Sequence, residues 1–297
     1  ISLDDSVDCV MNKNPLTLQL GASRKEAVEL MQRKDILAIP IVSFGKCVGL
    51  ESIQIKDSKR RYENPVFLMA GGFGSRLWPL TKDCPKPLLK VGDKPILESV
   101  LNSFIASGFV NFFISTHYFP EMIREYFGDG SKWNVSITYT YEEAPLGTGG
   151  ALGLLPKTVS DLPLILMNGD LLTTVDFEKV LEFHNKGESS ATLCVREYEH
   201  QVPFGVINGD GTNVSSMEEK PVQRFFVNAG IYVISSELRK TVMPNEYLDM
   251  PTLLQRAIDG DKAVSMFPIY EYWLDIGMLD DYDKAQRDFN DLGLLNA

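Results

Sequence analysis

The chain of 297 residues is long enough for one domain of ordinary size and a small additional unit. Its composition, 44% hydrophobic and 23% charged, is typical of a folded globular protein and excludes a disordered or fibrous chain. The net charge of −11 argues against a nucleic-acid partner, because phosphates repel an acidic surface; we expect the short basic run at residues 56–61 to be a solvated linker.

We expect no membrane partner, because apolar stretches such as residues 65–70 and 162–167 are much shorter than the roughly 20 residues of a spanning helix. No secretory signal is visible at the start. The first residue is Ile1 rather than methionine, so we expect a processed or trimmed piece of a longer chain. The four cysteines form no CxxC pair, which argues against disulfides and zinc and favours the cytoplasm.

Residues 1–57 predict a small strand–helix–strand–strand unit. Ser23 stands three residues before Glu26, which is a capping-box pattern, and the helix should run to about Lys34. The strands are expected at residues 16–18, 38–42 and 47–50. A unit of this size buries too little apolar surface to be stable comfortably by itself.

A polar linker at residues 56–64 is expected to precede a larger domain, residues 65–297, in which strands and helices alternate. The strands are expected at residues 66–70, 112–116, 135–139, 164–168, 191–197, 226–234 and 270–275. The helices are expected at residues 96–107, 121–127, 175–185, 250–259 and 280–291. This order predicts a Rossmann-like α/β fold, with a mostly parallel mixed sheet flanked by helices. Turn signals at 208–211 add a smaller antiparallel section within residues 192–233.

The strongest chemical signal is residues 71–89, GGFGSRLWPLTKDCPKPLL, directly after the first strand of the larger domain. Open α/β sheets bind ligands at the carboxyl ends of their strands. Glycines let backbone N–H groups approach a phosphate chain, and fixed cations contact the same oxygens. The residues concerned are Gly71, Gly72, Gly74, Arg76 and Lys86. The segment matches neither the GxGxxG fingerprint nor the Walker pattern, so it predicts a phosphate site of another kind.

This segment resembles the signature of the sugar-1-phosphate nucleotidyltransferases, GGxGTRLxPLT…PKPLLPV. Ser75 replaces the usual threonine, and Lys90 stands where proline is common. Later segments match in the right order, so the resemblance covers about residues 65–290. It implies an enzyme of the EC 2.7.7 type, which condenses a nucleoside triphosphate with a sugar 1-phosphate to an NDP-sugar and pyrophosphate.

The resemblance also implies which residues bind the nucleotide and the metal. The glycine segment with Ser75 would bind the phosphates, and EEAPLGTGGAL, residues 142–152, would form the nucleobase pocket. The residues of that pocket are Glu142, Gly147, Thr148 and Gly149. Asp170, at the end of an apolar strand, and Asp275, in WLDIG, resemble the family's Mg²⁺ pair. Two carboxylates suit Mg²⁺, which takes its other ligands from phosphates and water.

A further group of residues is implied for the sugar phosphate. Glu219 and Lys220 match the family's EKP motif, and Asn228 its NAG turn. Lys220 would bind the sugar phosphate, and the sugar itself would contact Glu219, Asn228 and Gly205. The implied catalytic residues are Arg76, Lys86, Asp170, Lys220 and Asp275.

The small unit resembles a CBS repeat, carried by Met11, residues 15–18 and residues 39–42. Such repeats work as pairs, so we expect half of a pair and a homo-oligomer formed through this unit. Ser52 matches a ribose-binding position, but Ile55 replaces the aspartate that follows it in the family. Nucleotide sensing and a plain docking role therefore both stay open.

Two alternatives concern the function as a whole. The attached CBS-like unit favours GTP with a mannose-, heptose- or glucosamine-type 1-phosphate, while UTP, dTTP and CTP stay open. A regulatory subunit that binds nucleotide or sugar without turnover is the other class. It is disfavoured because an inactive homologue would be expected to lose some of the five catalytic residues, and all five are present.

Overall fold

The computed structural model describes residues 6, 11–12, 14–34, 36–52 and 61–292, and the chain divides into two compact units, residues 1–60 and 61–297. Most of the predicted linker at 56–64, together with Ile55, lies outside the described residues. Its last residues do not form a linker, because the first strand of the larger unit already begins at Tyr62.

The small unit has the predicted order of elements. It consists of β1 Leu18–Gln19, α1 Arg24–Lys34, β2 Ala38–Ser43 and β3 Lys46–Ser52. β1 pairs in parallel with β2, which pairs antiparallel with β3. The Ser23 hydroxyl accepts a hydrogen bond from the Glu26 amide at 3.2 Å, so the predicted cap is present. Of the described residues of this unit, only Ala27, Met31 and Ile39 are fully buried, so its core is very small.

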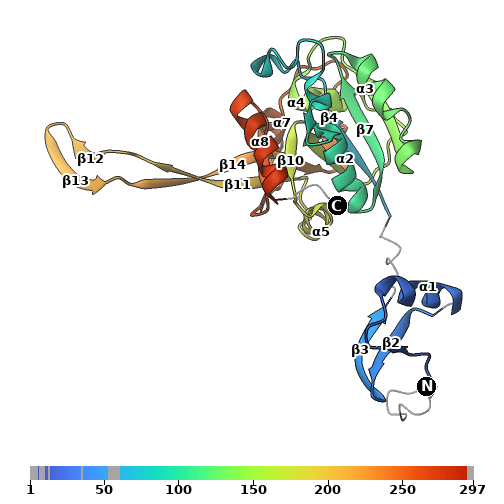
Figure 1. Ribbon diagram of the computed structural model, residues 1–297. Helices are drawn as coiled ribbons and strands as arrows, with labels where there is room; N and C mark the ends of the chain where they lie inside the picture. The colour runs from blue at the N-terminus through green and yellow to red at the C-terminus, as the bar shows by residue number, and fades with distance from the viewer. Residues whose placement is uncertain (1–5, 7–10, 13, 35, 53–60, 293–297) are drawn as a thin grey trace. The chain divides into compact units, whose positions relative to one another are not determined.

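The larger unit is built on a seven-stranded sheet in the order β15-β11-β14-β9-β4-β7-β8 (Figure 1). The strands are β4 Tyr62–Met69, β7 Phe109–Thr116, β8 Ser136–Tyr141, β9 Leu164–Asn168, β11 Ala191–Gln201, β14 Val222–Ile234 and β15 Val264–Pro268. β9, β4, β7 and β8 run parallel, and β14 is antiparallel to both of its neighbours. The predicted mostly parallel mixed sheet is therefore confirmed.

Helices cover both faces of this sheet, as alternating strands and helices require. The first face carries α2 Ile96–Ala106, α3 Pro120–Phe127 and α5 Phe177–Lys186, and the second carries α4 Gly147–Gly150, α6 Ser236–Arg239 and α7 Met250–Asp259. On the first face Phe104 stacks on Phe177 with 3.7 Å between ring centroids. None of the helices in the described part of the chain is long and apolar enough to cross a membrane.

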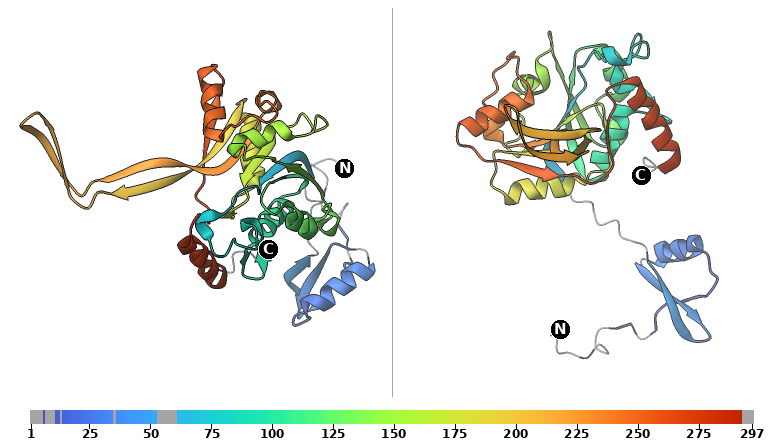
Figure 2. Two further views of the ribbon diagram at one scale, coloured as in Figure 1. Left: turned by 90° about the horizontal axis from the view of Figure 1, so that it is seen from above. Right: turned by 90° about the vertical axis from the view of Figure 1, so that its left-hand side faces the viewer.

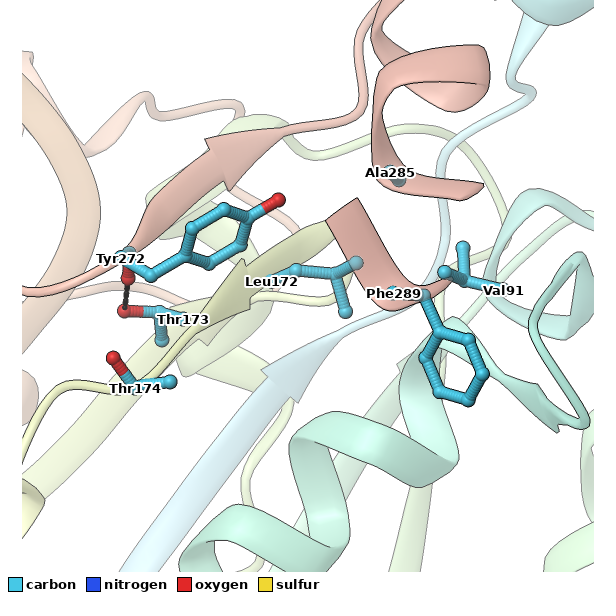
Figure 3. Close-up of a pocket in the computed structure, with 7 residues that line it drawn as sticks. All are labelled: Val91, Leu172, Thr173, Thr174, Tyr272, Ala285 and Phe289. Carbon is cyan, nitrogen blue, oxygen red and sulfur yellow. Dashed lines mark hydrogen bonds between the residues drawn. The ribbon is translucent and has the colours of Figure 1, made fainter. Parts of the chain in front are cut away.

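A second, two-stranded sheet lies beside the main one. β10 Leu171–Thr173 pairs antiparallel with β16 Trp273–Asp275, and α8 Leu279–Leu292 packs over it together with the short hairpin of β5 Lys90–Val91 and β6 Lys94–Pro95. The gap beneath α8, between Tyr272 and Phe289, has a volume of about 10 Å³ (Figure 3). That is room for no more than about one water molecule, so this gap is a packing defect rather than a substrate site.

The predicted antiparallel section forms an arm. β11 and β14 run on beyond the sheet and continue into the hairpin of β12 Gly205–Asp210 and β13 Asn213–Glu219 (Figures 1 and 2). The arm projects from the rest of the unit, and its outer residues are exposed. The sequence predicted an antiparallel section here, with strands at 191–197 and 226–234, but neither the strands of the outer hairpin nor the projection.

Phe104→Ala should lower the free energy of unfolding by about 3–5 kcal/mol, because it leaves a cavity beside Phe177 in the core. Urea unfolding followed by circular dichroism measures this change. Met243→Ala is the control, because that side chain is exposed and its loss should change the stability by less than about 0.5 kcal/mol. Equal effects for the two variants would contradict the assigned core.

Acidification should destabilise the larger unit through His184, a buried residue on α5 that is hydrogen-bonded to the Thr192 hydroxyl. Burial lowers the pKa of His184, so the unfolded chain binds the proton more readily than the folded one. The free energy of unfolding should therefore fall as the pH drops through about 6.5. Urea titrations across this range should show a smaller fall for His184→Asn; an identical fall in both proteins would show that other groups cause it.

Candidate active site

A cleft of about 350 Å³ opens at the carboxyl ends of β4 and β9. This volume is within the range of small-molecule sites, and the position is the one expected for an open α/β sheet. Nine of the residues singled out in the sequence line it: Gly71, Gly72, Arg76, Lys86, Glu142, Gly147, Thr148, Asp170 and Asp275. The glycine segment, the segment at 142–150 and the two aspartates therefore meet in one place, although they are spread over two hundred residues of sequence.

The glycine segment forms the floor and one wall of the cleft. It leaves β4 and turns into a short 3₁₀ helix, Ser75–Leu77, through Gly74, whose φ of 63° is unfavourable for other residues. The Thr81 hydroxyl donates a hydrogen bond to the carbonyl of Gly74 at 2.9 Å and holds the bend. A Cβ at Gly71 would lie 2.9 Å from the carboxylate of Glu142, so a larger residue there would displace that carboxylate.

Two contacts bring the distant aspartates together. The amide of Gly169 donates to the carbonyl of Met69 at 2.9 Å, which fixes the chain before Asp170 beside the glycine segment. A Cβ at Gly169 would lie 2.5 Å from that same carbonyl, so the approach requires glycine. On the other side, the pairing of β10 with β16 sets Leu171 opposite Asp275. Asp170 and Asp275 therefore face the same cleft.

The charges in the cleft are strongly coupled. Lys86 is nearly buried, and its ammonium group lies 2.5 Å from one carboxylate oxygen of Asp170. The other oxygen of Asp170 is buried and has no hydrogen-bond partner. Burial, and then the charge of Asp170, raise the pKa of Asp275, while Lys86 and Arg76 act in the opposite direction. An additional cation would give the unpaired oxygen a partner and would reduce the repulsion between the two carboxylates.

The segment at 142–150 lines the cleft next to the glycine segment, with the Glu142 carboxylate against Gly71. Glu142 is buried and accepts a hydrogen bond from the Leu146 amide at 3.1 Å. The Thr148 hydroxyl accepts one from the Met250 amide at 2.8 Å, and the Thr148 amide donates to Asp249. These bonds fix Gly147 and Thr148 at the cleft, where a flat ligand can lie against exposed backbone.

Seven of the proposed site residues do not line the cleft. Gly74 and Ser75 shape the bend next to it, and Gly149 packs on the backbone of Leu248 instead. Asn228 lies at the base of the arm and hydrogen-bonds to the Tyr232 hydroxyl at 2.6 Å. Gly205, Glu219 and Lys220 are exposed on the arm, outside the cleft of their own chain.

Some lining residues were not assigned a role from the sequence, namely Phe73, Pro87, Pro145 and Asn168. All four stand inside or next to the quoted motifs, so proximity to a glycine or a catalytic residue was the available signal. Asn168 has a buried side-chain oxygen without a hydrogen-bond partner, which marks it as a candidate ligand-binding group.

Curated relatives agree with the resemblance found in the sequence. The mannose-1-phosphate guanyltransferase of Yarrowia lipolytica is 32% identical over 228 residues, which cover 72% of this chain and 61% of the relative. The mannose-1-phosphate guanylyltransferase of Mycobacterium tuberculosis is 29% identical over 231 residues, 74% of this chain and 63% of the relative. The chain thus spans about three fifths of the length of these relatives.

Solved structures show the same fold. HddC from Yersinia pseudotuberculosis, complexed with GMP-PN, superposes with a TM-score of 0.60 at 25% identity, over 76% of this chain and 99% of that chain. An apo-UDP-glucose pyrophosphorylase superposes with a TM-score of 0.61 at 18% identity, over 78% of this chain and 99% of that chain.

Family models assign both parts of the chain. The CBS domain model matches residues 7–50, which confirms the resemblance of the small unit. The nucleotidyl transferase model matches residues 66–291, which include the whole cleft. The chain therefore belongs to the nucleotidyl transferase family.

Proposed function

We propose that this chain condenses a nucleoside triphosphate, preferably GTP, with a sugar 1-phosphate to give an NDP-sugar and pyrophosphate. The observation that carries the proposal is the convergence of Asp170 and Asp275 on a cleft bounded by the glycine segment. Paired carboxylates beside phosphate-binding backbone and two cations suit the transfer of a nucleotidyl group between anions.

The triphosphate is proposed to lie along the glycine segment, with its base against Gly147 and Thr148. Backbone amides of Gly71 and Gly72 would contact phosphate oxygens, which glycine allows at close range. Arg76 is exposed at the cleft mouth, where its fixed charge suits the departing pyrophosphate. Glu142 supports this wall from behind through its bond to Leu146.

Asp170 and Asp275 are proposed to hold a magnesium ion. Members of this family generally use a divalent metal. The fit rests on the unpaired buried oxygen of Asp170 and on the shared cleft of the two carboxylates, where desolvation and then the charge of Asp170 raise the pKa of Asp275. Two carboxylates are enough for Mg²⁺, which takes its other ligands from phosphates and water. When bound, this ion would neutralise charge on the reacting phosphates.

In the proposed reaction an oxygen of the sugar 1-phosphate attacks the α-phosphorus of the triphosphate. The new P–O bond forms as the bond to pyrophosphate breaks, and pyrophosphate leaves with the electron pair. The nucleophile is already an anion, so the residues need only align the two substrates and offset their repulsion. Lys86, fixed by Asp170, is proposed to contact the α-phosphate, and Lys220 the sugar phosphate.

The preference for GTP and a mannose-, heptose- or glucosamine-type sugar is supported by the relatives, which are named as mannose-1-phosphate guanyltransferases, and by the GMP-PN complex of HddC. The alternative of an inactive regulatory subunit is disfavoured, because Arg76, Lys86, Asp170 and Asp275 all line one cleft.

Two other expectations from the sequence stay predictions. The first is the cytoplasmic location, which the free thiols of Cys47, Cys84 and Cys194 support. The second is that the CBS unit pairs with another copy; it is supported by the exposed apolar side chains of Leu20 and Leu50.

Asp170→Asn should lower turnover at least about a hundredfold while the protein stays folded, because it removes charge at the reacting phosphates. Pyrophosphate release with saturating Mg²⁺ measures this, and thermal unfolding checks the fold. Asp161→Asn, an exposed acid paired with Lys240, is the control and should keep wild-type turnover. Near-normal pyrophosphate release by folded Asp170→Asn would refute the metal assignment.

Among the four common nucleoside triphosphates combined with mannose, heptose, glucosamine, N-acetylglucosamine and glucose 1-phosphates, GTP pairs should give the highest kcat/KM. Triphosphates with other bases should give a kcat/KM at least about tenfold lower, because this wall would recognise the base largely through hydrogen bonds. Coupled pyrophosphate detection measures every pair in one plate. No turnover with any pair would instead favour the regulatory-subunit alternative.

A further inference from the structure

The arm, which projects from the rest of the unit (Figures 1 and 2), carries large apolar side chains that are exposed. Phe204 and Met217 are 73% and 74% exposed. The others are Tyr198, Ile207, Val214, Val222, Phe225 and Phe226. A two-stranded hairpin without a third strand or a helix against it is only marginally stable in water. Exposed apolar side chains gathered on such a hairpin therefore mark an interface.

The arm leaves the body at the edge where the cleft opens. β14 is antiparallel to β9, and Ile231 pairs with Met167. The earlier part of β14 therefore runs past the carboxyl end of β9, and β11 accompanies it. The base of the arm touches the cleft through Gly230, which packs directly on the side chain of Asn168.

Lys220 lies too far along the arm to serve this cleft. From Asn228 to Val222, β14 is paired with β11 at each position, so the strand is extended. At about 3.3 Å per residue these six residues span about 20 Å, which exceeds the reach of a lysine side chain. Moving Lys220 to the cleft of its own chain would break the hydrogen bonds between β11 and β14, and each broken bond costs free energy.

Lys220 also has a left-handed φ of 47° at the bend between β13 and β14. Non-glycine residues in this conformation are uncommon and concentrate at functional positions. Its neighbour Glu219 pairs with Gly205 across the hairpin. The three sugar-site residues of the arm thus form one group, built into the hairpin and separated from their own cleft.

We propose that two copies of this chain associate through their arms, and that each arm completes the partner's active site. This inference rests on the function proposed above. Side by side around a two-fold axis, two arms bury exposed apolar side chains such as Phe225 against each other, as an isologous interface requires. The far part of each arm then reaches the base of the other, and Lys220 of the partner subunit enters the cleft beside Asn228.

The rim of the cleft suits such an arm. Phe73 and Trp78 are exposed on the glycine segment and its continuation, although both are large and apolar. Phe73 also lines the cleft and contacts the rings of His117 and Tyr118. An apolar arm that covers these side chains would remove water from the bound phosphates and strengthen every charge interaction there.

Complementation between two inactive full-length variants tests the proposal. Lys220→Gln damages only the arm, and Asp170→Asn only the cleft. The two chains are co-expressed with different affinity tags and purified through both tags. A mixed dimer contains one cleft with intact Asp170 that receives an intact partner arm. Mixed dimers should recover about half of the wild-type turnover per dimer, whereas each variant alone stays at least about a hundredfold below wild type.

The matched control combines Asp170→Asn with Lys86→Gln. Both lesions lie in the cleft, so every cleft of that mixed dimer is damaged and no recovery is expected. Phe225→Glu placed in both chains of the first pair should abolish the recovery by disrupting the interface. Ile258→Glu, at an exposed apolar position on α7, should preserve it.

The remaining outcomes separate the two proposals. If the wild-type chain is active but the two tags do not purify together, or the purified mixed dimer shows no recovery, each arm does not serve its partner and the inference is overturned. A wild-type chain that is inactive with every substrate pair refutes the proposed function and the composite site with it.

Discussion

The close approach of Gly169 to the carbonyl of Met69 is the constraint on which the rest of the site depends. This contact holds the end of β9 against the end of β4, so that Asp170 enters the cleft next to the glycine segment. The chain then continues directly into β10, whose pairing with β16 brings Asp275 in from more than a hundred residues away. A side chain at position 169 would push these elements apart and separate the two carboxylates.

Electrostatics explains why such an arrangement is retained. Two acids that face one cleft repel each other, and this repulsion adds to partial desolvation in raising the pKa of Asp275. Lys86 offsets part of it but contacts only one oxygen of Asp170. The site is therefore preorganised for further positive charge and for anionic ligands between the cations, instead of being neutralised within the protein.

The architecture separates the two substrates. The nucleotide wall is fixed by hydrogen bonds to residues 248–250, whereas the residues expected to contact the sugar lie on an arm with no core of its own. An arm that serves a second chain would link catalysis to assembly, because a monomer would keep its nucleotide site and lose part of its acceptor site. The proposed pairing of CBS units would add a second contact between chains.

The sequence by itself determined the fold class, the order of elements and the chemical motifs. The glycines before Arg76 and the aspartates at strand ends can be recognised from the residues next to them in the sequence. It also predicted the helix at residues 250–259 in agreement with the structure, because its apolar spacing and flanking residues are local.

Only the tertiary structure decided which of the motifs meet. Asp275 reaches Asp170 through a strand pairing that no local pattern encodes, and Lys220 is carried away from the cleft by an uninterrupted β ladder. Which strands pair, and over what length, depends on contacts between residues far apart in the sequence. The presence of a motif in the sequence therefore does not tell which cleft its residues reach.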